Sequence, residues 1–183
     1  TNISVVANFK KLPNIPLRNN EKLSNLFRFV FVGRISEGKG IKETLEALKI
    51  LSLVENNFEV DFYGPIEEKF DLVTKNSNYC GFLDFQHNSE IAYSKLCQYD
   101  CMLFPTYWKG EGFPGVIIDA FIAGLPVIAT DWNMNTEIIE DGINGFIIPP
   151  YDTVSLANKM MWVMDNRETL ITISARNNKK AKQ

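Results

Sequence analysis

The 183 residues of this chain suffice for one domain with a sizeable core, since 45% of them are hydrophobic and 12% aromatic. Nineteen basic and twenty-two acidic residues give a net charge of −3, which argues against binding to nucleic acid or an anionic membrane through a general basic field. The longest apolar tract, residues 116–129, is interrupted by Asp119, Gly124 and Pro126 and is shorter than the roughly 20 residues of a membrane-spanning helix.

The first 25 residues have the composition of a linker, with two prolines and a polar cluster at residues 18–22. We interpret residues 1–25 as the remnant of a connection to a preceding domain. Residues 26–166 are expected to form the folded domain. Residues 167–183 are expected to form a C-terminal helix with a polar tail.

Short apolar runs alternate along the chain with segments of helical periodicity. The predicted strands are residues 26–33, 58–64, 79–83, 101–104, 126–130 and 145–148. The predicted helices are residues 41–54, 67–75, 89–99, 114–123, 135–140 and 152–164. Such alternation indicates an α/β fold, a Rossmann-like doubly wound parallel sheet of about six strands with helices on both faces. Ligands of these folds bind at the carboxyl ends of the strands.

The octapeptide GRISEGKG, residues 33–40, joins the first predicted strand to the first predicted helix. Its glycines permit a tight turn, and the start of the helix offers free N–H groups to an anion. Arg34 and Lys39 can add two positive charges there. A diphosphate would fit this site, and the plainer alternative is a glycine-rich turn with two solvated cations.

The same octapeptide nearly matches the Walker A pattern through Gly33, Gly38 and Lys39. Gly40, however, stands where that pattern needs a hydroxyl for Mg²⁺, and Arg34 would crowd a loop that wraps phosphate with backbone amides. The dinucleotide fingerprint G-x-G-x-x-G is absent from this turn. A P-loop NTPase and a nicotinamide-dependent enzyme are therefore both disfavoured.

Two acids follow further along the chain, Glu111 in a glycine-rich loop and Asp119 in a predicted helix. On one regular helix they would lie about 12 Å apart along the axis and roughly 80° apart around it, too far to share one water molecule. They are expected to make two separate ligand contacts. Phe113 and Trp108 near Glu111 suggest a lined cleft. The alternatives are a surface loop acid for Glu111 and an exposed helix position for Asp119.

The cysteines and the histidine give no support to a metal site. Cys80, Cys97 and Cys101 lack metal-ligand spacing and are expected to be free, buried thiols in a reducing compartment. His87, the one histidine, stands in a polar run and is interpreted as a loop residue. A zinc site and a histidine-based triad are therefore not expected.

Taken together, these segments resemble the C-terminal, nucleotide-sugar-binding half of a GT-B glycosyltransferase of family four, the glycosyl transferases group 1. The residues that carry the resemblance are GRISEGKG at 33–40, EGFPGVIID at 111–119, AGLPVIATD at 123–131, and Glu137-Ile138-Ile139 followed by DGINGFIIPP at 141–150. The resemblance covers most of the chain and implies that residues 26–166 are a nucleotide-sugar-binding Rossmann-like domain. It implies a retaining enzyme that transfers a sugar from a nucleotide donor.

The resemblance also implies roles for individual residues. Arg34 and Lys39 would grip the donor diphosphate and stabilise it as the leaving group, and Glu111 would contact the hexose; these three are the expected catalytic residues. Asp119 would bind the ribose, but it stands where the family has Glu, and its reach is shorter by about 1.5 Å. The expected donor-binding residues are Gly33, Arg34, Lys39, Glu111, Gly112, Phe113, Pro114, Gly115 and Asp119.

The function implied is that of a hexosyltransferase in polysaccharide biosynthesis, with a donor such as a UDP- or GDP-hexose. No metal and no cofactor are expected. A glycan or glycolipid acceptor would bind through a missing N-terminal domain, so this domain is not expected to be active alone. No nucleic-acid partner is expected, and the location would be cytoplasmic, with the full-length protein free in solution or peripheral at the cytoplasmic membrane face. The alternatives are a non-catalytic nucleotide-sugar-binding module and a nucleotide-sugar epimerase.

Overall fold

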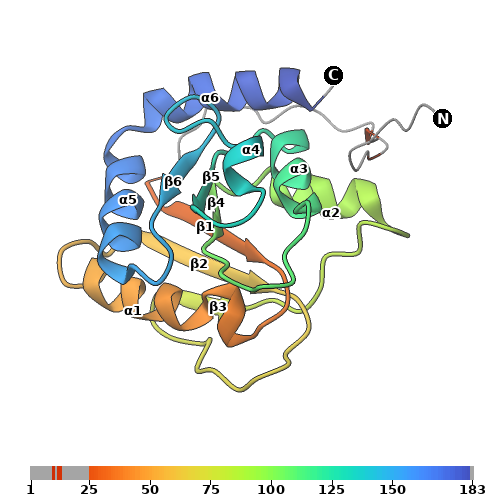
Figure 1. Ribbon diagram of the computed structural model, residues 1–183. Helices are drawn as coiled ribbons and strands as arrows, with labels where there is room; N and C mark the ends of the chain where they lie inside the picture. Colours follow the sequence, from red (N-terminus) through yellow and green to blue (C-terminus); the bar gives the residue numbers. More distant parts are fainter. Residues whose placement is uncertain (1–9, 11, 14–24, 182–183) are drawn as a thin grey trace.

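The computed structural model describes residues 10, 12–13 and 25–181 of the chain (Figure 1). Their centre is a six-stranded sheet in the order β3-β2-β1-β4-β5-β6, and all neighbouring strands are parallel. The strands are β1 (Phe27–Val32), β2 (Phe58–Tyr63), β3 (Ser77–Tyr79), β4 (Cys101–Phe104), β5 (Val127–Thr130) and β6 (Phe146–Ile148). This is the strand order of a doubly wound sheet. The chain adds β2 and β3 on one side of β1 and then β4, β5 and β6 on the other, so the order of the strands reverses between β1 and β4. The predicted Rossmann-like α/β fold is confirmed.

Helices cover both faces of the sheet (Figure 1). They are η1 (Glu37–Lys39), α1 (Ile41–Leu51), α2 (Ser89–Leu96), α3 (Gly115–Ile122), α4 (Asn135–Ile138), α5 (Thr153–Asp165) and α6 (Arg167–Lys180). Alternate residues of β1 point to opposite faces, as the pleat of a strand requires. Phe29 and Phe31 pack with α1 and α5 in one core cluster, whereas Val30 packs with α2 and α3 in the other. The sheet is therefore buried on both sides.

The start of α5 is fixed by a capping side chain. Asp152 Oδ1 accepts a hydrogen bond of 2.9 Å from the backbone N–H of Ser155, which satisfies one of the free donors at the helix start. Helix α6 follows after Asn166 and packs against α3 and α5. Among the residues described, no helix has the length and apolarity needed to cross a membrane.

Two predictions for the segment between β2 and α2 are wrong. Residues 67–75 form no helix: Glu67 and Glu68 donate their N–H groups to Ile35 O, and the segment carries no continuous apolar stripe, since Val73 is 66% exposed. The strand predicted at 79–83 is β3, which ends at Tyr79. Its first residue, Ser77, can be buried although it is polar, because its hydroxyl donates to Leu72 O at 2.8 Å. A pattern of apolar residues cannot reveal such a contact.

The interpretation of residues 1–25 as a linker lies outside the described residues, except at positions 10, 12–13 and 25. The division of the chain after residue 166 stays a prediction.

Candidate functional site

The two glycine-rich segments meet at the carboxyl edge of the sheet, because β1 and β4 are neighbours there. Gly40 has a φ of 74°, and a Cβ atom on it would lie 2.2 Å from the carbonyl oxygen of Pro105, the residue that follows β4. The N–H of Tyr107 donates to Gly38 O at 2.9 Å. No Ser or Thr can replace Gly40 without a clash, which gives a structural reason against a P-loop at this turn.

Lys39 and Glu111 form the centre of this site. Lys39 Nζ donates to Glu111 Oε2 in a short contact, and the two side chains are only 9% and 11% exposed. Thr106 Oγ1 donates to the same Oε2 at 2.9 Å, and Asn133 Nδ2 donates to the backbone oxygen of Glu111 at 2.8 Å. The opposite charges compensate each other where little water reaches them. The alternative of a surface acid at position 111 is wrong.

Arg34 lies beside this pair on the face of Trp108. Its guanidinium carbon is 4.0 Å from the centre of the indole ring, and Lys39 Nζ is 4.8 Å from the same ring. Arg34 also pairs with Glu67 at 3.4 Å, with about a third of its side chain exposed. Attraction to the ring favours both cations beside Trp108.

Asp119, on α3, makes contacts separate from those of Glu111. It is 2% exposed, so the alternative of an exposed helix position is wrong. Tyr93 OH donates to Asp119 Oδ1 at 2.6 Å, and Lys10 Nζ donates to Asp119 Oδ2 in a short contact. Burial and the neighbouring Asp119 raise the pKa of Tyr93, which therefore stays protonated and donates. Both carboxylate oxygens are engaged.

The remaining predicted residues line the same edge of the sheet. Gly33 directly follows β1, and Gly112 has open space around it. Phe113 packs partly against the core, Pro114 is the N-cap of α3, and Gly115 is its first residue. The structure thus brings Arg34, Lys39 and Glu111 together. Among the described residues, Asp119 shares no hydrogen-bonding partner with Glu111.

Sequence reasoning missed Lys10, Tyr93 and Thr106, which hold the two acids. None belongs to a glycine-rich or acidic motif, so their spacing carried no signal. Thr106 could have been suspected from its place two residues after a buried strand, where ligand-binding side chains gather.

The thiols and the histidine stand apart from this cluster. No disulfide joins the three cysteines, as expected, and Cys101 is buried. The prediction of burial is wrong for Cys80, which is exposed, and for Cys97, which is only partly buried. Cys80 is exposed because it follows the end of β3, an edge strand of the sheet. His87 is 80% exposed beside Asp84. Over the described ranges, no group of three His, Cys, Asp or Glu side chains could hold a metal ion.

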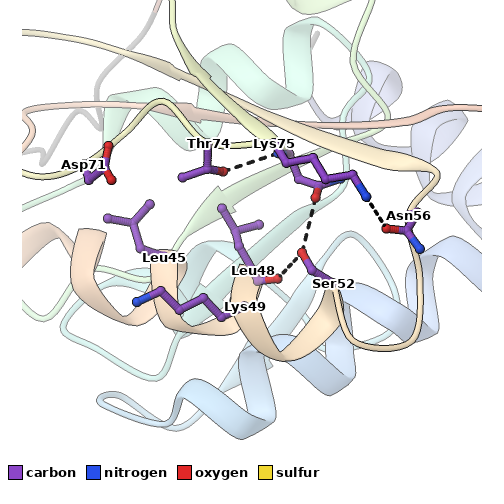
Figure 2. A pocket seen from close by; sticks show the side chains of 9 residues that line it. Leu45, Leu48, Lys49, Ser52, Asn56, Asp71, Thr74 and Lys75 are labelled. Carbon is purple, nitrogen blue, oxygen red and sulfur yellow. Dashed lines mark hydrogen bonds between the residues drawn. The ribbon is translucent and has the colours of Figure 1, made fainter.

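A hollow of about 470 Å³ lies at the opposite edge of the sheet, between α1 and the segment before β3. Figure 2 shows Leu45, Leu48 and Lys49 of α1 on one wall and Thr74 and Lys75 on the other. Lys75 Nζ donates to Asn56 Oδ1 at 2.8 Å. None of the predicted site residues lines this hollow. The candidate site is therefore identified by its charged side chains and not by this cavity.

Comparison with known proteins assigns the family. Residues 16–181 match the family described as glycosyl transferases group 1, and the chain belongs to it. It is 32% identical over 159 residues to an uncharacterized 41.2 kDa protein in the cps region of Klebsiella pneumoniae, covering 86% of this chain and 41% of that protein. It is 27% identical to the capsular polysaccharide biosynthesis glycosyltransferase CapM of Staphylococcus aureus, covering 82% and 40%. The chain therefore spans about two fifths of the length of these relatives.

Solved structures show the same fold. Anabaena HepE in complex with UDP-glucose has a TM-score of 0.72 and 21% identity, over 87% of this chain and 44% of HepE. The C-terminal domain of the group 1 glycosyl transferase LpcC from Francisella tularensis has a TM-score of 0.69 and 22% identity, over 84% of this chain and 83% of that one. The chain is thus a Rossmann-like domain of a glycosyltransferase family with relatives in polysaccharide biosynthesis.

Proposed function

We propose that this chain is the donor-binding domain of a retaining glycosyltransferase that moves a hexose from a nucleoside diphosphate sugar to a glycan or glycolipid. The observation that carries the proposal is the nearly buried pair of Lys39 and Glu111 beside Arg34. The pair lies at the carboxyl ends of β1 and β4, where the strand order of the sheet reverses. The structural relative HepE, solved with UDP and with UDP-glucose, supports a donor of this kind.

Lys39 and Arg34 would act on the diphosphate. In the free domain Glu111 compensates the charge of Lys39. A bound diphosphate would supply a second anion, so that Lys39 binds phosphate oxygen while Glu111 accepts hydrogen bonds from hexose hydroxyls. As the bond between the anomeric carbon and the diphosphate breaks, negative charge grows on the leaving oxygen. Cations fixed in a site with little water stabilise that charge more strongly than they would in water.

The acceptor hydroxyl would attack the same face of the sugar that the diphosphate leaves. Its oxygen forms the new bond to the anomeric carbon, and its proton passes to the departing phosphate oxygen. Glu111 and Asp119 do not resemble the paired carboxylates of glycosidases, which lie about 5 Å apart and flank one bond. They are held instead by different partners on different elements. In this proposal no metal is required, since cationic side chains and helix amides serve the phosphates.

The whole enzyme would need a second domain for its acceptor. The chain covers 41% of its Klebsiella relative, and a GT-B enzyme forms its active site between two such domains. We expect donor binding without efficient transfer from this chain alone. A cytoplasmic location, with or without peripheral attachment of the full-length protein to the membrane, belongs to the same proposal.

Calorimetric titration with UDP-, GDP- and ADP-sugars tests the proposal. The wild type should bind at least one donor, and Arg34→Ala and Glu111→Ala should each weaken that binding by about tenfold or more, which corresponds to about 1.4 kcal/mol. Lys49→Ala is a matched control, since Lys49 is an exposed lysine at the opposite edge of the sheet. Unchanged affinity in both Arg34→Ala and Glu111→Ala would show that the site is wrongly assigned.

A further inference from the structure

Three neighbouring strands are each followed by an aromatic side chain at the carboxyl edge of the sheet. Tyr107 follows β4, Trp132 follows β5 and Tyr151 follows β6. Because β4, β5 and β6 are adjacent and parallel, their carboxyl ends lie at one edge, which is also the edge that holds Lys39 and Glu111. The aromatic side chains therefore extend the candidate site along the sheet towards β6.

The three rings contact one another, and we call Tyr107, Trp132 and Tyr151 the aromatic platform. Tyr107 and Tyr151 stack with ring centres 4.1 Å apart and planes inclined by 36°. Trp132 meets Tyr151 edge to face, at 6.3 Å and 89°. The hydroxyl of Tyr107 donates to the Glu43 carboxylate on α1 at 3.2 Å. Tyr151 is 59% exposed, so a ligand can reach its ring from solvent.

Hydrogen bonds join the aromatic platform to the candidate site. Trp132 Nε1 donates to the backbone oxygen of Trp108 at 2.9 Å, and Trp108 carries Arg34 on its ring. Asn133, the residue after Trp132, donates to the backbone oxygen of Glu111 at 2.8 Å. The loop after β5 is thus fixed to the loop that carries the site acid. Rings held in this way lose little conformational freedom when a ligand binds.

The backbone conformation of Tyr151 is unusual for a bulky residue. Its φ is 61°, in the left-handed region that side chains with a Cβ atom rarely adopt. Glycine adopts the same conformation without strain. Non-glycine residues in such conformations cluster at binding sites and active sites. The backbone by itself would favour glycine at position 151, yet the position carries an exposed aromatic ring.

The surroundings of the platform favour a neutral sugar as its ligand. A pyranose ring carries C–H groups on its faces and hydroxyls around its edge, so it can pack face-on against an aromatic ring while its hydroxyls bond to polar groups. Asp131, directly before Trp132, offers an exposed carboxylate that can accept from such hydroxyls. A nucleotide would bring further negative charge close to this acid, whereas a neutral sugar would not.

We propose that the aromatic platform binds a sugar ring of the glycan or glycolipid acceptor, with one face of the sugar on Tyr151 and hydroxyls donating to Asp131. This inference rests on the proposed function and deepens it. If the transferred hexose is held at Glu111, the sugar that accepts it has to bind beside that residue, and the platform is joined to it there. The donor-binding domain would then contact the acceptor itself, in addition to the second domain.

Amide NMR titration of this chain with neutral methyl glycosides tests the inference. The probes are the methyl glycosides of glucose, galactose and N-acetylglucosamine. At least one should bind the wild type and shift the indole N–H signal of Trp132. Tyr151→Gly removes the ring and relieves the backbone, so the domain should stay folded while its affinity for the glycoside falls by about fivefold or more. Tyr151→Phe keeps the ring and should retain the affinity.

Two further variants sharpen this test. Asp131→Ala should also weaken glycoside binding, whereas Asp131→Asn keeps an acceptor oxygen and should retain most of the affinity. Trp162 provides the matched control, because it is an aromatic residue 39% exposed and lies about 14 Å along α5 from the first residue of that helix. Trp162→Leu should bind the glycosides as well as the wild type does.

Three results would overturn the inference. The first is that none of the glycosides binds the wild type, and the second is that Tyr151→Gly binds them as well as Trp162→Leu does. The third is competition: a saturating nucleoside diphosphate should leave the glycoside affinity unchanged. If UDP, GDP or ADP displaces the glycoside, the platform belongs to the donor and not to the acceptor.

The inference and the proposed function can fail separately. The donor titrations of Arg34→Ala and Glu111→Ala contain no glycoside, and the glycoside titrations contain no donor. If donors bind as proposed and glycosides do not, only the role of the platform fails. If glycosides bind through Tyr151 and no donor binds the wild type, the proposed function fails and the platform stands as a sugar site.

Discussion

Lys39 and Glu111, separated by 72 positions in the sequence, form an ion pair with about nine tenths of each side chain buried. Removing one partner leaves an uncompensated charge in a place with little water. Lys39→Met and Glu111→Gln should each lower the free energy of unfolding by about 3 kcal/mol, and the double variant should regain much of this loss. Urea unfolding measures all three variants.

The partly exposed pair of Arg28 and Glu59, at 3.0 Å, provides the control for that cycle. Its removal should cost less than about 1 kcal/mol, because solvent screens both charges. Strictly additive losses for Lys39 and Glu111 would contradict the view that each compensates the other.

Alanine substitutions at three glycines separate two effects on stability: the strain of a positive φ, and the clash of an added Cβ atom with its neighbours. Gly40→Ala combines a φ of 74° with a Cβ atom 2.2 Å from Pro105 O and should destabilise most, by about 3 kcal/mol. Gly81→Ala has a φ of 79° and open space, and should cost about 1 kcal/mol. Gly112→Ala meets neither problem and should change stability by less than about 0.5 kcal/mol. Any other order in thermal or urea unfolding would argue against this geometry at the turn.

Thr106 has the one buried hydroxyl that donates to Glu111 within the described part of the chain, at 2.9 Å. Thr106→Val keeps the shape and removes the donor, so it should lower the free energy of unfolding by about 1 to 2 kcal/mol and weaken donor binding. Thr106→Ser keeps the hydroxyl and should retain the affinity for the donor. Equal donor affinity in the Val and Ser variants would show that this bond does not position Glu111.

The stability of the domain should fall at high pH because of buried tyrosines. Burial raises the pKa of Tyr63 to about 12, from an ordinary value of 10.0, and raises the pKa of Tyr99, whose hydroxyl donates to Asp61. Above pH 10.0 the unfolded chain loses these protons while the folded one keeps them, so the free energy of unfolding decreases as the pH rises from about 10 towards 12.

Urea unfolding across this pH range checks that dependence. Tyr63→Phe should reduce the loss of stability at high pH, and the exposed Tyr151→Phe serves as its control. A Tyr63→Phe variant with the same pH dependence as the wild type would refute the assignment to Tyr63.

Donor binding should not depend on a divalent metal ion. Arg34, Lys39 and the amides at the start of α3 are proposed to bind the phosphates directly, so excess chelator should leave the calorimetric affinity unchanged. Loss of binding in chelator that is restored by Mg²⁺ would instead favour the P-loop alternative.

Much of the fold could be predicted because its signals are local. β1 alternates between two buried faces, α1 carries an apolar stripe, and Asp152 caps α5, each within a few residues of sequence. The segment at residues 67–75 was mispredicted because several of its backbone N–H groups donate to Ile35 and Ser77 rather than to the carbonyl four residues earlier, as in a helix. No local pattern records such partners.

The sequence by itself determined the class of fold, the family resemblance and the candidate residues Arg34, Lys39 and Glu111, because glycines, charges and apolar periods are properties of short segments. Only the tertiary structure decided which side chains meet. Lys39 contacts Glu111 because β1 and β4 are neighbours in the sheet, and Tyr93 contacts Asp119 because α2 packs on α3. Lys10 reaches Asp119 from 109 positions away in the sequence. Burial makes these contacts necessary, since a carboxylate away from water is costly unless a hydrogen-bond donor or a cation lies beside it.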